Sequence, residues 1–166
     1  MSKEEPIVKE LIDNLPQVGR VSAISIRPKR RQMPEEVDEV LAGEHGLEGD
    51  HFASEYSDKR QVTLIQKEHL DVVASILEKE SIDPRLTRRN IVVSKINLLS
   101  LRNKKFQIGD AIMEFTGDCH PCSRMEENLG GGGYNAMRGH GGITARIIKP
   151  GFIRINSPVK LLKDQS

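Results

Sequence analysis

Apolar residues recur at helical spacing in three stretches of the chain, which predicts three helices. In residues 6–15 they occupy one face, at Ile7, Val8, Leu11, Ile12 and Leu15. Pro6 suits the first turn of such a helix and Pro16 ends it, and we expect its apolar face to pack. Residues 67–80 predict a longer amphipathic helix, and residues 123–129 predict a third.

Strand patterns dominate the rest of the chain. Apolar runs that alternate or are rich in β-branched residues occupy residues 18–26, 61–65, 91–93, 106–108, 111–115, 143–147 and 153–161. The short connection Gly109-Asp110 predicts a hairpin between two of them. Because many short strands occur with few helices and no regular alternation, we predict an α+β fold, a β-barrel-rich single domain with a few peripheral helices. Residues 1–17 would form an N-terminal helical extension, and residues 18–163 the main domain.

Three polar loops separate these elements. Residues 27–38 begin with the basic run Arg27-Pro28-Lys29-Arg30-Arg31 and are predicted to form a solvated loop. Residues 43–51 contain three glycines, which indicates unusual backbone angles and a loop of fixed shape. Gly130 to Gly133 form either a flexible connector or an anion-binding nest, but without a following Lys-Ser or Lys-Thr pair they are no P-loop.

The composition narrows the class of protein. The 166 residues carry a net charge of +1, and no aromatic residues interleave with the basic run, so we expect no nucleic-acid partner. No stretch approaches the roughly 18 consecutive apolar residues of a membrane span, and the polar N-terminus lacks a signal-peptide core. The two cysteines would close only a small loop as a disulfide, so we expect reduced thiols in a cytoplasmic protein.

Both cysteines belong to one motif, Cys119-His120-Pro121-Cys122, directly before the predicted helix at 123–129. Backbone N–H groups and the helix dipole stabilise a thiolate at the start of a helix, and Cys122 is better placed for this than Cys119. Such a thiolate could attack an electrophile or bind a metal ion.

Three other interpretations of the cysteine pair stay open. A thioredoxin-like dithiol has the same local context, although in that fold most of the domain follows the motif. A zinc site would need histidines to complete its ligand set, from among His45, His51, His120 and His140. Two inert buried cysteines are the plainest alternative.

Six sequence blocks resemble, in order, the MOSC domain, which is the C-terminal domain of molybdenum cofactor sulfurases and also occurs as stand-alone bacterial proteins of similar size. The blocks are Gly46-Leu47-x-Gly49-Asp50-His51, Lys59-Arg60-Gln61-Val62-Thr63-Leu64-Ile65, Arg88-Arg89-Asn90-Ile91-Val92-Val93, Phe106-x-Ile108-Gly109-Asp110, Cys119-x-Pro121-Cys122 and Arg138-Gly139-x-Gly141-Gly142. Each block alone is a weak signal, but chance would not also preserve their order. The resemblance covers roughly Val18 to Leu162.

The resemblance implies a β-barrel-rich fold, a cytoplasmic protein and a relation to the molybdenum cofactor, a pterin dithiolene (molybdopterin). It implies that Cys122 is the family's invariant thiol, either a molybdenum ligand or a persulfide carrier, and that Cys119 supports it. A thiolate can serve in both roles, since it is a soft metal ligand and a nucleophile toward sulfur. Residues that could hold the phosphate and pterin are Asp50, His51, Arg60, Arg89, Asn90 and Arg138. Pyridoxal phosphate is not expected.

Two functions follow from the resemblance. The first is a molybdenum-dependent reductase of N-hydroxylated compounds with Cys122 as molybdenum ligand. Because the chain shows no flavin or iron-sulfur motif, a partner reductase would supply the electrons. The second is a sulfur carrier that passes persulfide sulfur through Cys122 between donor and acceptor proteins during metal-sulfur cofactor assembly. A regulatory or structural domain without catalysis is a third alternative, and a membrane is not an expected partner.

Overall fold

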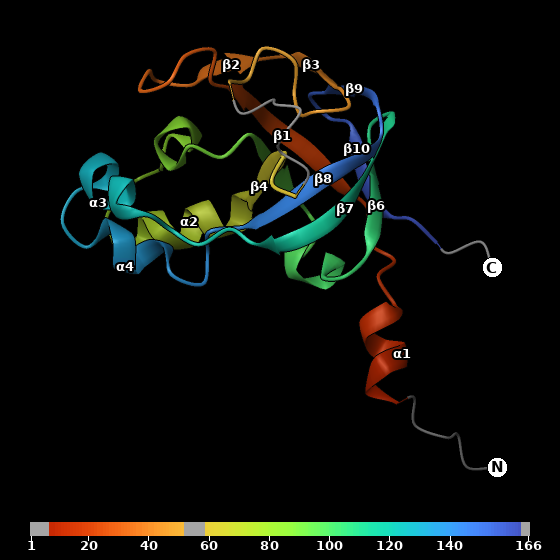
Figure 1. Cartoon of the computed structure of the whole chain (residues 1–166). Coiled ribbons are helices and arrows are strands. Elements are labelled where there is room, and N and C mark those ends of the chain that lie inside the picture. The colour runs from red at the N-terminus through yellow and green to blue at the C-terminus, as the bar shows by residue number, and fades with distance from the viewer. Residues whose placement is uncertain (1–6, 52–58, 164–166) are drawn as a thin grey trace.

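A closed β-barrel forms the body of the protein (Figure 1). The computed structural model describes residues 7–51 and 59–163. Seven strands follow one another around the barrel in the order β10-β6-β7-β8-β4-β5-β1, and pairing of Gly19 with Val159 joins β1 back to β10. Their bounds are β1 Gly19–Ile26, β4 Val62–Gln66, β5 Ile91–Ser94, β6 Lys105–Ile108, β7 Ala111–Asp118, β8 Ile143–Lys149 and β10 Pro158–Leu161. The predicted α+β, barrel-rich fold is therefore confirmed.

Three further strands lie outside the barrel ring. Strand β2 (Glu35–Val37) extends the sheet beyond β1, and β3 (Glu39–Ala42) pairs with β9 (Gly151–Arg154) in a separate two-stranded sheet. The sequence pattern assigned residues 35–38 to a solvated loop, and this assignment is wrong for β2. The predicted hairpin is confirmed, because β6 and β7 pair directly through Ile108 and Ala111 around Gly109, whose φ is 57°.

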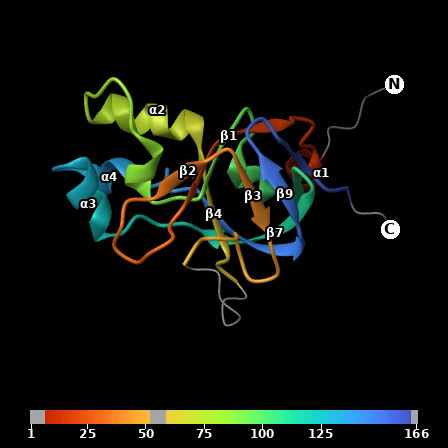
Figure 2. The same cartoon turned by 90° about the horizontal axis from the view of Figure 1, so that it is seen from above.

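Strands β4 and β5 are buried on both faces, which explains their continuous apolar runs. Leu64 and Ile91 point into the barrel core, whereas Ile65 and Val92 belong to a second core on the outer face. The two strands are parallel, and the segment that connects them in the sequence contains α2 (Lys67–Ile76). Helices α3 (Ser123–Leu129) and α4 (Gly133–Met137) complete the second core at the same end of the barrel as α2 (Figure 2). Two 3-10 helices, η1 (Pro84–Thr87) and η2 (Leu98–Leu101), flank β5 in the chain.

The N-terminal helix α1 (Val8–Asp13) projects from the opposite end of the barrel (Figure 1). Its apolar side chains are 54–69% exposed at Ile7, Val8, Leu11 and Ile12. The prediction that this face packs against the rest of the chain is therefore wrong. Lys104 contacts the end of the helix, since its Nζ donates to the Ile12 carbonyl at 3.1 Å and lies 3.4 Å from the Asp13 carboxylate. No helix in the described parts of the chain is both long and apolar enough to cross a bilayer.

The glycine run between α3 and α4 binds a carboxylate of the protein itself. Glu126 accepts hydrogen bonds from the backbone N–H groups of Gly132 at 2.6 Å and Tyr134 at 3.1 Å. A Cβ on Gly133 would lie 2.7 Å from the Leu129 side chain, so close helix packing also requires a glycine. The run is therefore an ordered turn between two helices, and the Gly132 N–H already has an anionic partner.

We expect Glu126→Ala to lower the free energy of unfolding by about 1–2 kcal/mol, because it removes a side-chain cap from two backbone donors at the start of α4. Urea denaturation of the two proteins measures this loss. Glu127→Ala is the matched control, since Glu127 is the neighbouring exposed carboxylate of the same helix. Equal losses in the two variants would contradict the capping role.

Candidate functional site

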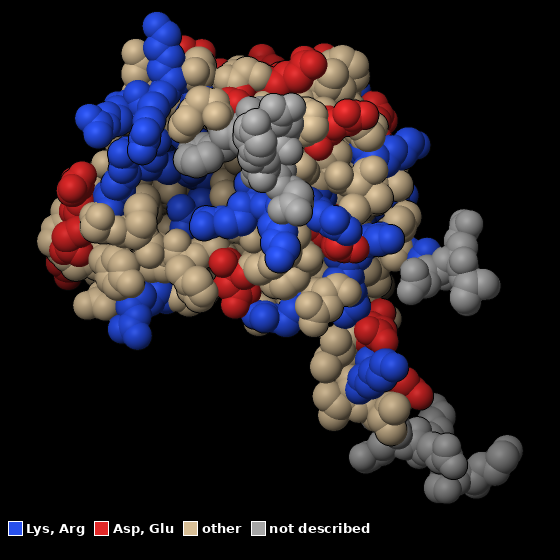
Figure 3. Space-filling view, in the orientation of Figure 1, with Lys and Arg blue, Asp and Glu red and all other residues tan. Residues whose placement is uncertain are grey.

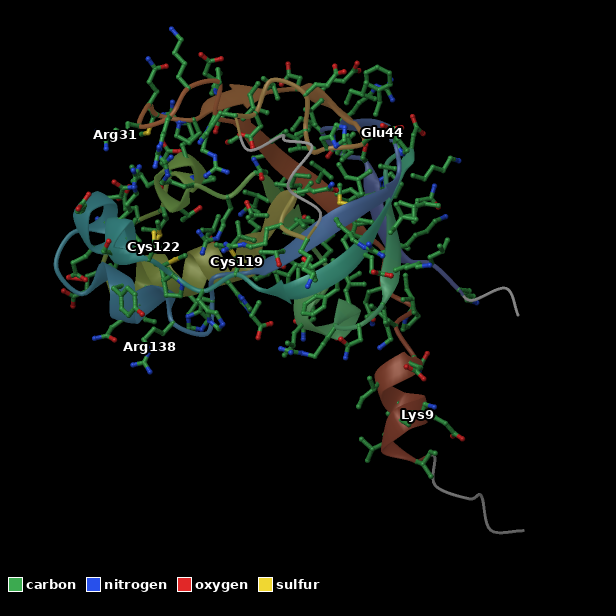
Figure 4. The ribbon with its side chains drawn as sticks, viewed as in Figure 1. Lys9, Arg31, Glu44, Cys119, Cys122 and Arg138 are labelled. Carbon is green, nitrogen blue, oxygen red and sulfur yellow. The ribbon has the colours of Figure 1, made fainter. Side chains whose placement is uncertain are left out.

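The two cysteines of the motif differ in exposure. Strand β7 ends at Asp118, and the segment 119–122 leads from it into α3, with Cys122 as the residue before the first helical position (Figure 4). Cys119 is 3% exposed, whereas Cys122 is exposed. Both thiols are free. Only Cys122 can therefore meet a partner or ligand without movement of the backbone.

Arg89 holds the cysteine segment in place. Its guanidinium donates to four carbonyl groups, those of Gly141 at 2.8 Å, Thr87 at 2.9 Å, and Cys119 and His120 at 3.2 Å each. The residue is 6% exposed, so the protein encloses nearly all of it. Arg89 thus links the end of η1, the cysteine segment and the loop before β8.

The glycines before β8 allow the cysteine segment to approach. A Cβ on Gly141 would collide with the Cys119 carbonyl and lie 3.2 Å from the Arg89 guanidinium. The Gly142 carbonyl in turn accepts a hydrogen bond from the Cys119 N–H at 2.9 Å. The Arg-Gly-x-Gly-Gly block thus contributes through its glycines to the position of the thiols.

Cys122 lines a pocket of about 440 Å³ that we call the arginine pocket. Six arginines line it, namely Arg27, Arg30, Arg60, Arg88, Arg89 and Arg124. Polar residues complete the lining, among them His51, Gln61, Thr63, Asn90 and His120. A large group of basic side chains is visible on the part of the surface above α3 (Figure 3). A pocket with this lining favours a multiply charged anion.

Two of these arginines show the electrostatic cost of the cluster. Burial lowers the pKa of Arg88, and the neighbouring charge of Arg124 lowers it further, while Cys122 and Asp50 oppose the change. Burial likewise lowers the pKa of Arg27, with added repulsion from Arg88 and Arg89. Since crowded guanidinium groups repel one another, a bound anion would relieve this repulsion.

Asp50 and His51 both hold Arg27 in place through hydrogen bonds to its backbone. The buried Asp50 carboxylate accepts a hydrogen bond from the Arg27 N–H at 2.8 Å and lies 3.5 Å from its guanidinium. His51 donates from its backbone N–H and from Nδ1 to the Arg27 carbonyl, at 2.7 and 2.9 Å. The glycine-containing loop that carries both residues is fixed, with φ of 86° at Gly49. Asp50 therefore supplies a negative charge that offsets part of the arginine cluster.

The other predicted site residues take different positions. Asn90 is buried, and its side chain bridges the Thr63 N–H at 3.0 Å and the Ser25 carbonyl at 3.2 Å, at the wall of the pocket. Arg60 lines the pocket at its exposed side. Arg138 does not line it and projects from the end of α4 away from Cys122 (Figure 4). The structure therefore brings together all of the predicted residues around the pocket except Arg138.

Sequence reasoning missed four pocket arginines: Arg27, Arg30, Arg88 and Arg124. Arg27 and Arg30 belong to the basic run that was assigned to a solvated loop. The close spacing of positive charges in this run was the sequence signal that could have indicated an anion-binding site. Arg88 belongs to the same recognised block as Arg89, and its backbone is left-handed, with a φ of 59°. The zinc alternative finds no support in residues 7–51 and 59–163, where no three His, Cys, Asp or Glu side chains form a metal-binding group.

Solved structures with the same fold include two kinds of bacterial protein. The YuaD protein from Bacillus subtilis superposes with a TM-score of 0.79 at 16% identity, over 92% of this chain and 100% of that one. YiiM from Escherichia coli gives 0.66 at 20% identity, over 89% and 71%. YiiM from Geobacillus stearothermophilus gives 0.70 at 14% identity, over 87% and 75%. At these identities the likeness shows the fold alone.

A sequence model of the MOSC domain matches residues 51–160. This match includes the strands of the barrel from β4 onward, the Cys119–Cys122 segment and the glycines that support it. No curated protein gives a significant match to the sequence. The family match spans well over half of the chain, and the protein therefore belongs to the MOSC domain family.

Proposed function

We propose that this protein binds the molybdenum cofactor in the arginine pocket, with Cys122 as its ligand to molybdenum. The observation that carries the proposal is the exposed thiol of Cys122 in a pocket of six arginines. The cofactor combines a soft metal centre with a phosphate-bearing pterin. The pocket offers a soft ligand and cationic donors for both parts.

Different residues of the pocket would bind the phosphate and position the thiol. Arg88 and Arg124 are the natural donors to a phosphate, because both line the pocket together with Cys122 and Arg88 interacts electrostatically with Arg124 and Cys122. Arg27 and Arg60 would add further donors at the other side of the pocket. Arg89, with four carbonyl partners, would instead position the thiol segment.

When bound, the cofactor would supply a redox-active metal, and we assign to the protein the reduction of N-hydroxylated compounds. Electrons would come from a partner reductase. The chain's contribution is to bind the cofactor, to fix Cys122 toward it and to keep Cys119 away from solvent. Molybdopterin is thus the proposed small-molecule partner.

A sulfur carrier is the second candidate, because the exposed position of Cys122 also allows another protein's sulfur donor to reach it. Cys122 would then carry a persulfide, and the arginines would stabilise its negative charge. A mass increase of one sulfur atom on the Cys122 peptide, in protein without molybdenum, would favour this second function.

Protein purified from a host that makes the cofactor should contain molybdenum and pterin in comparable amounts, measured by elemental analysis and pterin fluorescence. Protein from a host that lacks the cofactor should contain neither. Cys122→Ser should abolish molybdenum retention, and Cys119→Ser, at the buried position, should reduce it only in part. Zinc without pterin, or equal losses in both variants, would contradict the proposal.

A separate prediction concerns the phosphate donors. Arg88→Ala and Arg124→Ala should each weaken pterin retention by roughly ten- to a hundredfold, because a charge-assisted hydrogen bond is worth about 1.5–3 kcal/mol. Equilibrium dialysis against free cofactor measures the affinity. Arg138→Ala is the matched control outside the pocket. A loss in the control equal to that in the pocket variants would refute the assignment of the phosphate site.

A further inference from the structure

A second pocket lies next to the arginine pocket. It has a volume of about 400 Å³, and the two pockets share Cys119 and His120 as a common wall. The second pocket is built by the start of α2, the η2 segment, the end of β7 and the loop before β8. Its lining is Gln66, His69, Asn97, Leu98, Leu99, Arg102, Asp118, Cys119, His120, Pro121, Gly139, Gly141, Gly142 and Ile143. We call it the neutral pocket.

The charged side chains of the neutral pocket neutralise each other. Arg102 donates from one nitrogen to both oxygens of Asp118, at 2.8 and 2.9 Å. The Arg102 guanidinium also lies over the Phe115 ring, 5.4 Å from its centroid. Because Arg102 is held by two partners, it is a fixed wall and not an open anion site. The neutral pocket therefore differs in charge from the neighbouring pocket, which six arginines line.

The lining of the neutral pocket also contains a histidine, His69. Burial lowers the pKa of His69, and the adjacent His140 lowers it further while Glu68 opposes the change, so the surroundings favour the neutral ring. The two rings meet edge to face with centroids 5.2 Å apart, and His140 Nδ1 donates to the Ala136 carbonyl at 3.0 Å. A neutral imidazole has one donor and one acceptor nitrogen. His69 can therefore serve a ligand that carries either group.

Apolar side chains and glycines make up much of the remaining lining. Leu98, Pro121 and Ile143 form an apolar wall, and Leu99 remains 54% exposed beside it. Gly139, Gly141 and Gly142 present only backbone to the pocket. The Gln66 amide is occupied, since its Oε1 accepts from the Leu98 N–H and its Nε2 donates to Glu68. A volume of this size lies within the range of small-molecule sites, about 300–1,000 Å³.

We infer that the neutral pocket is a second ligand site, which binds a small, uncharged, partly apolar molecule with an amide-type donor and acceptor. Its lining offers no net charge to an anion, yet it combines an apolar wall with a neutral imidazole. The site is separate from the proposed cofactor site, and neither needs the other to be occupied. A ligand here would contact Cys119 and His120, which also line the arginine pocket.

Benzamide and benzoate provide a matched pair of probes, since they differ in charge but hardly in shape. Titration of the full ¹⁵N-labelled chain with benzamide should shift the amide signals of Gly139, Gly141 and Ile143. Benzoate should leave these signals unchanged. Equal shifts with both probes, or no shifts at these residues with benzamide, would overturn the inference. Shifts confined to Val8 and Leu11, which line a different hollow beside α1, would overturn it as well.

Two substitutions then assign the binding to the neutral pocket. His69→Ala and Leu99→Ala should each weaken benzamide binding by about three- to tenfold, through loss of a hydrogen bond and of an apolar contact. Ile76→Ala is the control, because Ile76 is 55% exposed on α2 but does not line the pocket. Unchanged affinity in both pocket variants would exclude the site. Because benzamide binding is measured without the cofactor, this test and the molybdenum assay can fail independently.

Discussion

Arg89→Ala should lower the free energy of unfolding by about 3–5 kcal/mol, because it leaves four buried or partly buried carbonyl groups without their donor. For a chain of this length the loss corresponds to a melting temperature lower by roughly 10 °C or more. The four acceptors belong to Gly141, Thr87, Cys119 and His120, and three of them adjoin the thiol site. Urea denaturation and thermal melting of the unliganded proteins measure the effect.

Arg138→Ala is the matched control, since Arg138 is exposed and makes only one long hydrogen bond, at 3.4 Å to Asn135. It should change the free energy of unfolding by no more than about 0.5 kcal/mol. Arg89→Lys should lose most of the stability, because one ammonium group cannot reach the acceptors that a planar guanidinium spans. A loss of under about 1 kcal/mol in Arg89→Ala would show that the residue faces a ligand and does not hold the thiol segment.

The strands of the barrel were predictable because burial repeats along the chain with a local period. The alternation in residues 111–115 gives β7, and the continuous run in 61–65 gives β4, with ends displaced by at most three residues. Closure of the barrel was not predictable, since the pairing of Gly19 with Val159 joins distant parts of the chain. Strand β2 was not predicted, because two of its three residues are exposed glutamates at the edge of a sheet and show no apolar alternation.

The position of Cys122 directly before a helix was also predictable, but the surroundings of the arginines were not. A sequence shows that Arg89 and Arg138 are cationic, but it does not show whether carbonyl groups or solvent surround them. Arg89 turned out to be enclosed by protein carbonyls, and Arg138 lies at the end of α4 outside the pocket. The pocket arginines come from four separate regions of the chain, which include Arg27, Arg60, Arg88 and Arg124. Only the fold brings these charges together.

Gly142→Ala should lower the free energy of unfolding by more than about 4 kcal/mol, an exceptional loss for one methyl group, because the added Cβ has no space. It would collide with the Leu64 carbonyl and lie 3.0 Å from the Ile65 Cα, both in the central strand β4. The φ of 87° at Gly142 adds strain for any residue with a side chain. Relief requires β4 and β8 to separate, which would also break the 2.9 Å bond between the Gly142 carbonyl and the Cys119 N–H.

Gly139→Ala is the control that separates the steric collision of an added Cβ from the backbone strain of a positive φ. Gly139 has nearly the same φ, 82°, but apart from its chain neighbours no atom of the described residues lies within 4 Å of its expected Cβ, so this variant should lose only about 1–2 kcal/mol. Urea denaturation gives both values, and the reaction rate of Cys122 with a thiol reagent reports whether the segment has moved. Since the Cys119 bond anchors that segment, the rate should change in any folded fraction of Gly142→Ala and stay constant in Gly139→Ala. Similar losses of stability in both variants would show that backbone strain alone, and not the close approach of β4, demands glycine at position 142.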